Sequence, residues 1–120
     1  MTSTKIIDFK NSTVTPAVSV VDAERRISGA PEQHLQNIYS SESKELLSGT
    51  WSSEVGKWSV DYSHRHEFCY LVRGHIVLTD ANGEESTFKA GDAFVIPIGF
   101  KGSWEVIEPV TKHYVIYNTP

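Results

Sequence analysis

The amino-acid sequence predicts an all-β protein built as an antiparallel sandwich or barrel. From about residue 36 onward, short runs of β-branched and aromatic residues alternate with Gly, Pro, Asn and Asp, which is the pattern of many short strands. The hydrophobic spacing of an amphipathic helix is nearly absent. A length of 120 residues is that of one ordinary domain.

The candidate strands follow one another along the chain, with turn-forming residues between them. In order they are Asn37–Ser40, Leu46–Trp51, Lys57–Tyr62, Glu67–Arg73, His75–Thr79, Ser86–Lys89, Ala93–Ile96, Ser103–Ile107 and Thr111–Tyr117. The most specific local signal is Asn82-Gly83, because this pair readily adopts the positive φ angles of a tight hairpin. Gly74 interrupts an apolar stretch and predicts a bend, a bulge or a turn.

The first 35 residues have a different composition, with Pro16, Gly29 and Pro31 inside a mixed polar segment. A short helix over residues 22–27 is one interpretation. The simpler interpretation is an arm that lies on the barrel or on a partner subunit. We therefore expect an N-terminal arm at 1–35 and a barrel domain at 36–120.

Composition excludes several classes of protein. No apolar run approaches the roughly 18 residues of a membrane-spanning helix, and the first residues lack the apolar core of a secretory signal. We therefore expect a cytoplasmic protein with no membrane association. The net charge is −4 and the longest basic cluster is Arg25-Arg26, so no nucleic-acid partner is expected. The single cysteine, Cys69, excludes an intrachain disulfide framework.

Two separated motifs resemble those of the cupin superfamily, whose members are small jelly-roll β-barrels. The first is Glu67-Phe-Cys-Tyr-Leu-Val-Arg-Gly74, and the second is Ala90-Gly91-Asp92-Ala-Phe-Val-Ile-Pro97-Ile-Gly99. The sequence is most similar to the subgroup named for the cupin domain of (S)-ureidoglycine aminohydrolase, which includes ethanolamine-utilisation cupins. The resemblance covers about residues 46–118 and implies a single antiparallel cupin barrel.

The resemblance also implies where a metal site would lie. Cupins carry the motifs G-x5-H-x-H-x3,4-E-x6-G and G-x5-P-x-G-x2-H-x3-N, whose three His and one Glu bind a divalent metal. Glu67 occupies the glutamate position, but the histidine positions fall on Asp61, Ser63 and Gly102, and the asparagine position falls on Val106. We therefore expect no metal and no cofactor.

The ureidoglycine aminohydrolase layout, with Glu, His, His and Gln as ligands, gives a second alignment. On it Asp61 replaces the Glu, Ser63 and Glu67 replace the His residues, and Gly102 takes roughly the Gln position. Two carboxylates without imidazole could bind Mg²⁺ or Mn²⁺ only together with several waters, because such ions prefer about six oxygen ligands.

His64 and His66 flank this region without matching the motif. Side chains alternate between the faces of a strand, so both histidines point away from the barrel if Glu67 points into it. The same alternation directs further side chains inward: Asp61, Ser63, Arg65 and Cys69. We expect His64 and His66 at the barrel rim. The alternative is a metal bound by both and a third group such as His113, through a β-bulge at residues 64–66.

Glu67 is the candidate catalytic residue, as a general acid, a general base or a carboxylate ligand. An inward carboxylate costs several kcal/mol unless it is paired or protonated, so a structural role beside Arg65 or Arg73 is the alternative. Cys69 is expected to be a small buried hydrophobe rather than a nucleophile. Trp104 alternates with Gly102 and Val106 and is expected to face the pocket.

These residues predict a small-molecule pocket near Glu67. Its expected lining consists of Asp61, Ser63, Cys69, Gly102, Trp104 and Val106. A mouth lined by Trp with one carboxylate suits a ligand that carries a cation or an amide. The opposite face of the same strand offers Phe68, Tyr70 and Val72, which stay exposed to solvent unless a partner or the N-terminal arm covers them. Cupins commonly dimerise through such a face, so the resemblance implies a homodimer.

Three functions are compatible with this pattern. The first is a small-molecule-binding cupin with a degenerate metal site. The second is an enzyme acting on a small amide, amine or sugar acid through Glu67. The third is a non-catalytic accessory subunit that binds its partner through the apolar outer face.

Overall fold

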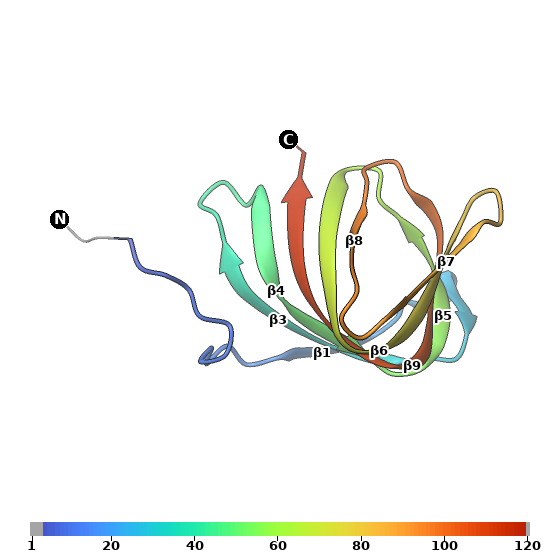
Figure 1. The fold of residues 1–120 in the computed structure, drawn as a ribbon, viewed down its shortest axis with the longest axis horizontal. Coiled ribbons are helices and arrows are strands. Elements are labelled where there is room, and N and C mark those ends of the chain that lie inside the picture. Colours follow the sequence, from blue (N-terminus) through green and yellow to red (C-terminus); the bar gives the residue numbers. More distant parts are fainter. Residues whose placement is uncertain (1–3, 120) are drawn as a thin grey trace.

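All paired strands in residues 4–119, the part of the chain that the computed structural model describes, run antiparallel. The elements are β1 (Ala17–Val20), the 3₁₀ turn η1 (Ala23–Arg25), β2 (Arg26–Ser28), β3 (Glu32–Ser40), β4 (Leu46–Ser53), β5 (Gly56–Asp61), β6 (Arg65–Asp80), β7 (Glu85–Lys89), β8 (Ala93–Ile96) and β9 (Lys101–Asn118). They form one strongly curled sheet (Figure 1). The predicted all-β fold is confirmed.

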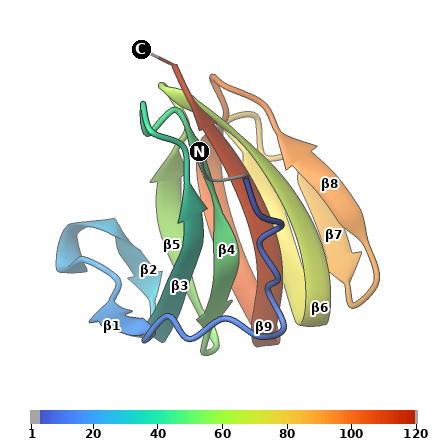
Figure 2. The same ribbon diagram turned by 90° about the vertical axis from the view of Figure 1, so that its left-hand side faces the viewer.

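The two longest strands, β6 and β9, form the spine of the sheet. They pair with each other from Arg65↔Asn118 to Asp80↔Gly102. The other edge of β9 is shared, because β4 pairs with its C-terminal half and β5 with its N-terminal half. The free edge of β6 is shared in the same way by β8 and β7. Figure 2 shows β7 and β8 on one side of this spine and β3 and β1 on the other.

Bulges allow these two strands to be so long. The sequence predicted two strands in place of β6, separated at Gly74, and two in place of β9, separated near Pro109. Gly74 instead has a φ of +100°, and the β6–β9 register shifts around it. A Cβ at Gly74 would lie 2.5 Å from the Pro109 carbonyl oxygen. Gly74 and Pro109 therefore mark a bend in a continuous pair of strands and end neither of them.

The Asn82-Gly83 hairpin between β6 and β7 is confirmed. Gly83 has a φ of +83°, and the Asp80 amide donates to the Glu84 carbonyl at 3.0 Å. The predicted short helix over 22–27 is reduced to the three-residue turn η1. None of the described residues forms a helix that is long and apolar enough to cross a membrane.

The N-terminal segment contributes strands to the sheet. β1 pairs with β3 and β2 pairs with β5. The expected boundary between an arm and a barrel, at residues 35 and 36, falls inside β3. Before β1 the chain crosses the outer face of the sheet, where the Val14 carbonyl accepts a hydrogen bond from the Gln36 side chain at 2.7 Å. There the Phe9 ring meets His113 edge-on, with centroids 5.3 Å apart.

The curl separates a concave inner face from a convex outer face. Inward side chains from β5, β6, β8 and β9 form a continuous buried cluster, with Leu71, Ile76 and Val110 fully buried. Alternate residues of β6, namely Phe68, Tyr70 and Val72, lie exposed on the convex face. The concave face therefore carries both the hydrophobic core and the cavity described below.

Gly102 lies where β6 and β9 approach each other closely, beside the Thr79 backbone. A Cβ at this position would overlap the Thr79 carbonyl oxygen. We therefore predict that Gly102→Ala destabilises the fold by about 1–3 kcal/mol, the usual cost of overpacking. Urea denaturation measures this change. Lys101→Ala, at the exposed neighbouring position, is the control and should change stability by less than about 0.5 kcal/mol. An unchanged midpoint for Gly102→Ala would show that the strands can separate without cost.

Candidate functional site

The concave face encloses a cavity of about 450 Å³. Its lining comes from β1, η1, β3, β4, β5, β6 and β9, and from Tyr62 just after β5. The lining residues are Ser19, Arg25, Gln33, Leu35, Asn37, Leu47, Trp51, Trp58, Val60, Tyr62, Arg65, Glu67, Trp104, Lys112, Tyr114 and Ile116. A hollow of similar volume lies on the outer face beside Pro16 and Arg73. The buried charges of the described chain belong to the concave cavity.

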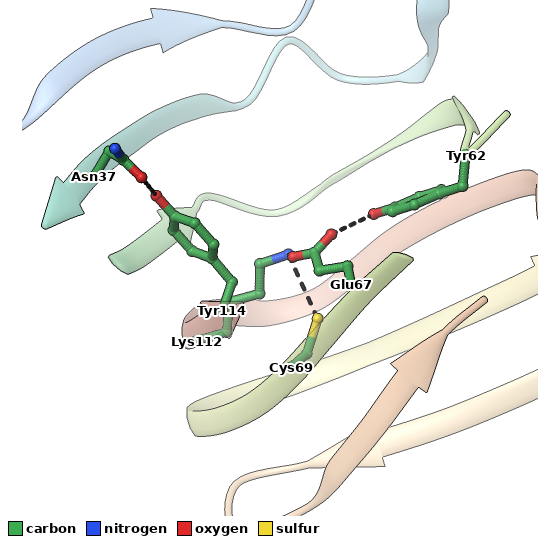
Figure 3. Close-up of polar contacts among 6 residues, drawn as sticks. All are labelled: Asn37, Tyr62, Glu67, Cys69, Lys112 and Tyr114. Atoms are coloured by element: carbon green, nitrogen blue, oxygen red, sulfur yellow. Dashed lines mark hydrogen bonds and ion pairs between the residues drawn. The ribbon is translucent and has the colours of Figure 1, made fainter. Parts of the chain in front are cut away.

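A buried ion pair forms the centre of this cavity (Figure 3). The Lys112 ammonium from β9 lies 2.5 Å from Oε2 of Glu67 on β6, and the two side chains are 7% and 3% exposed. The Tyr62 hydroxyl donates to the other carboxylate oxygen, Oε1, at 2.8 Å. Both oxygens of Glu67 therefore have a donor from this chain, which compensates the cost of burying the carboxylate.

Tryptophan side chains surround the ammonium group. Lys112 Nζ lies 4.7 Å from the ring centroid of Trp51 and 4.4 Å from that of Trp104, both within cation–π range. Trp58 stacks on Trp104 with centroids 6.4 Å apart. From the sequence, a ligand that carries a cation or an amide was expected beside Trp and the carboxylate. This chain's own Lys112 occupies that position.

The ion pair keeps both partners charged near neutral pH. Burial alone would raise the pKa of Glu67, but the charge and the hydrogen bonds of Lys112 and Tyr62 more than offset burial and hold the pKa below its ordinary value. Burial alone would lower the pKa of Lys112, yet the Glu67 carboxylate holds it above its ordinary value. The site therefore presents a carboxylate and an ammonium, not a neutral acid and a neutral amine.

Burial keeps three neighbouring groups protonated: the Cys69 thiol and the hydroxyls of Tyr62 and Tyr114. Cys69 is fully buried, with Sγ 3.8 Å from Lys112 Nζ, and burial raises the pKa of its thiol to about 12. Burial and the adjacent Glu67 carboxylate also raise the pKa of Tyr62. Burial, followed by the charge of Glu67, raises the pKa of Tyr114 to about 12, and its hydroxyl donates to Asn37 Oδ1 at 2.8 Å. The two tyrosine hydroxyls are therefore hydrogen-bond donors at neutral pH, and the Cys69 thiol, which accepts a hydrogen bond from Lys112, is not ionised as a nucleophile would be.

The structure separates the residues that the sequence analysis grouped as one site. Glu67 and Trp104 line the cavity. Cys69 contacts the ion pair but is not part of the lining. Val106 is 1% exposed within the hydrophobic core, and Gly102 lies at the close approach of β6 and β9.

Asp61 and Ser63 are not among the residues that line this cavity. Both are exposed, and the Ser63 backbone amide donates to the Asp61 carboxylate at 2.9 Å. The prediction carried strand alternation from residue 67 back to residue 61. A turn at Ser63-His64 separates β5 from β6 and resets that alternation, so Tyr62 points inward instead.

The described residues do not fit a divalent metal. Among them, no three His, Cys, Asp or Glu side chains lie close enough together to bind one ion. His66 accepts a hydrogen bond from the Ile98 amide at 3.0 Å, and His113 bonds Thr50 at 3.0 Å. Glu67 contacts an ammonium and a phenol, which are donors and not metal ligands.

Lys112 and Tyr114 line the cavity but were not predicted from the sequence. Val110, Lys112 and Tyr114 are all buried and have the same parity in β9. A lysine at an inward position of a strand is the signal that could have revealed the site. That signal can be interpreted only when the strand register is known, because the register places Lys112 opposite Trp51.

Comparison with known proteins identifies the family. The model of the EutQ-like cupin domain matches residues 40–114. No curated protein matches the sequence. The fold resembles a protein of unknown function of the DUF861 family from Pseudomonas syringae, with a TM-score of 0.78 and 27% identity over 92% of this chain and 46% of that one. The chain thus spans about half the length of that relative.

Two further structures have similar folds. A DUF861 family protein from Thermotoga maritima is 34% identical over 54% of this chain and 73% of that chain, with a TM-score of 0.52. A putative ethanolamine utilization protein Q from Salmonella typhimurium is 15% identical over 91% of this chain and 100% of that chain, with a TM-score of 0.67. The second likeness shows the fold alone.

The ion pair leads to a prediction about stability. Lys112→Met leaves Glu67 buried without its counter-charge and should cost about 3–5 kcal/mol at pH 7. The double variant Glu67→Gln/Lys112→Met removes both charges and should recover most of that loss. Urea denaturation of the wild type, both single variants and the double variant measures the coupling. Additive effects of the two single changes would contradict the pairing.

The same variants test the pH dependence. Because the pKa of Glu67 is lowered on folding, its stabilisation is complete above the ordinary value of about 4.3 and is lost as the pH falls through the lowered value. Because the pKa of Lys112 is raised, its stabilisation is lost only above about 10.4. The wild type should therefore lose stability relative to the double variant at both extremes. Glu84→Gln, an exposed control, should follow the wild type.

Proposed function

Because the chain belongs to the family of EutQ-like cupin domains, we propose that it binds a small organic molecule in the cavity on its concave face. The observation that carries this proposal is the composition of the cavity wall. Three tryptophans, two tyrosines and four aliphatic side chains line the cavity together with seven polar side chains, two of which form a fixed ion pair. Ligand sites typically combine an apolar wall with a small number of fixed polar groups.

The protonation states favour binding over catalysis at Glu67. A general acid must carry a proton at the working pH, whereas Glu67 is held ionised with both oxygens engaged. The Lys112 amine is held protonated, and a nucleophilic amine must be neutral. The Cys69 thiol is buried and protonated. These side chains shape and polarise the cavity without offering an activated group.

An enzyme acting on a small amide, amine or sugar acid is the alternative. Chemistry of the ureidoglycine aminohydrolase kind would use the aligned positions 61, 63, 67 and 102, and of these only Glu67 lines the cavity. For catalysis, a ligand would have to displace Lys112 or Tyr62 from Glu67 and so free a carboxylate oxygen as a base. Turnover that disappears in Glu67→Gln would establish that function.

The binding proposal is tested with a panel of small organic molecules. Ligand binding should raise the melting temperature and change the fluorescence of the tryptophans that line the cavity. Val60→Phe fills the cavity from its lining and should weaken binding at least tenfold. Val95→Phe, on the convex face, is the matched control and should bind as the wild type does. Equal binding by both variants would place the ligand elsewhere, and consumption of the ligand would favour the enzyme.

We also propose that the convex face joins two copies of this chain. Val95, Phe68 and Val115 are register partners across β8, β6 and β9, so they form one row of apolar side chains. They are 59%, 43% and 39% exposed, and Tyr70 and Val72 continue the patch along β6. Water-facing sides of antiparallel sheets are usually polar, so a contiguous apolar row indicates a covered surface.

The dimer is tested by light scattering at micromolar concentration. The wild type should have twice the mass of one chain, and Phe68→Glu should give a monomer with an unchanged circular dichroism spectrum. Val55→Glu places the same charge on an exposed apolar residue of the β4–β5 connection and should remain dimeric. A monomeric wild type would refute the homodimer and leave the face available to a different partner.

A further inference from the structure

We propose that the ligand of the concave cavity is a small carboxylate with an apolar body, and that Arg65 binds its carboxylate group. This inference rests on the proposed binding function and specifies its ligand class. It follows from the charges of the cavity wall, from the unpaired donors there, and from the tryptophan and aliphatic side chains of the lining, against which an apolar body can pack.

The cavity wall has an excess of positive charge. Its charged lining residues are Glu67 and three cations, Arg25, Arg65 and Lys112. Lys112 and Glu67 neutralise each other. Arg25 lies 3.7 Å from the Asp22 carboxylate, so it also has a counter-charge. No carboxylate of residues 4–119 forms an ion pair with Arg65, which leaves its guanidinium as the uncompensated charge of the wall.

The Arg65 side chain is held in place beside the cavity. Arg65 precedes Glu67 by two residues on β6 and therefore has the same parity. Its guanidinium carbon lies 4.6 Å from the ring centroid of Tyr62, in cation–π geometry. The Nε atom is buried without a hydrogen-bond partner among the described residues. A buried donor without an acceptor is destabilising, so a ligand oxygen that reached it would form a favourable hydrogen bond.

The other polar groups of the wall also favour an acceptor on the ligand. Trp104 Nε1 is a second buried donor without a partner in the described chain. The acceptors of Glu67 and Asn37 are already used, because both Glu67 oxygens bond Lys112 and Tyr62, and Asn37 Oδ1 bonds Tyr114. Around the ion pair, the buried polar atoms without a partner in the described chain are therefore donors. A group that only accepts hydrogen bonds, such as a carboxylate, complements them.

A carboxylate fits better than a cation or a phosphate. The position for a cation, between the tryptophans and Glu67, is filled by Lys112. Phosphate sites generally use several unpaired backbone amides, at a helix N-terminus or in a glycine-rich turn. Most of this wall consists of paired strands, whose amides bond within the sheet. One planar guanidinium matches one carboxylate in charge and geometry.

The experiment uses matched sets of probes in which one carbon skeleton carries a carboxylate, a carboxamide or a primary ammonium group. Benzoate, benzamide and benzylamine form one set, and butyrate, butyramide and butylamine form another. Affinities are measured by titration calorimetry and tryptophan fluorescence on the full chain. We expect each carboxylate that binds to do so at least tenfold more tightly than its amide and its amine.

Substitutions then assign the preference to Arg65. Arg65→Met should remove the tenfold preference for the carboxylate while the amide binds as before. Arg65→Lys should retain only part of the preference, because an ammonium group lacks the planar pair of donors with which a guanidinium binds both carboxylate oxygens. Arg73→Met is the control, since Arg73 is exposed on the same strand and bonds Thr111 outside this cavity. Its affinities should match those of the wild type.

The possible outcomes separate this inference from the binding function. Amides or amines that bind as tightly as the carboxylates would overturn the ligand class and leave the binding function intact. A carboxylate preference that persists in Arg65→Met would overturn the role of Arg65. Failure of every probe, in every charge class, to bind would overturn the binding function together with the inference.

Discussion

A buried carboxylate in an apolar sheet is unstable without a counter-charge, and the contact between Lys112 and Glu67 supplies it. The register explains how the contact forms. Lys112 lies opposite Trp51 on β4 and opposite Leu71 on β6, so its side chain emerges beside an indole ring. From there it runs past Cys69 and reaches the carboxylate of Glu67. Strands β6 and β9 must therefore keep their mutual register for the ion pair to exist, and β4 must keep its register with β9 for Trp51 to lie beside the ammonium.

The fold was predictable because its signal is repeated along the chain. Each of several short apolar runs, with a turn between neighbours, points to the same all-β architecture, so an error in one run does not change the result. The lengths of β6 and β9 were less predictable. Glycine and proline usually end strands. Here Gly74 on β6 lies against Pro109 on β9, both strands bend at this point, and their pairing continues on both sides of it.

The site was predictable only within a single strand. Alternation along β6 correctly placed Glu67 and Cys69 on the inner face and Phe68 and Tyr70 on the outer face. It failed for Asp61 because the turn between β5 and β6 resets the alternation. The sequence alone does not give the number of residues in such a turn, and one residue more or less reverses the direction of every side chain before it. Lys112 was missed for a different reason. Its importance comes from Glu67, which is 45 residues away in sequence, and only the register of β6 and β9 brings them together.

The internal ion pair also sets the charge of the cavity wall around Glu67. Glu67 stands at the glutamate position of the cupin motif, and its counter-charge in this chain is an ammonium group that belongs to the protein. Because the two pKa values move apart on folding, both charges persist through the physiological range of pH. The Glu67–Lys112 pair is therefore electrically neutral as a whole, and both oxygens of the carboxylate are engaged by donors of this chain. The remaining charge near this pair is that of Arg65, whose guanidinium lies over the Tyr62 ring and forms no ion pair with a carboxylate of the described chain.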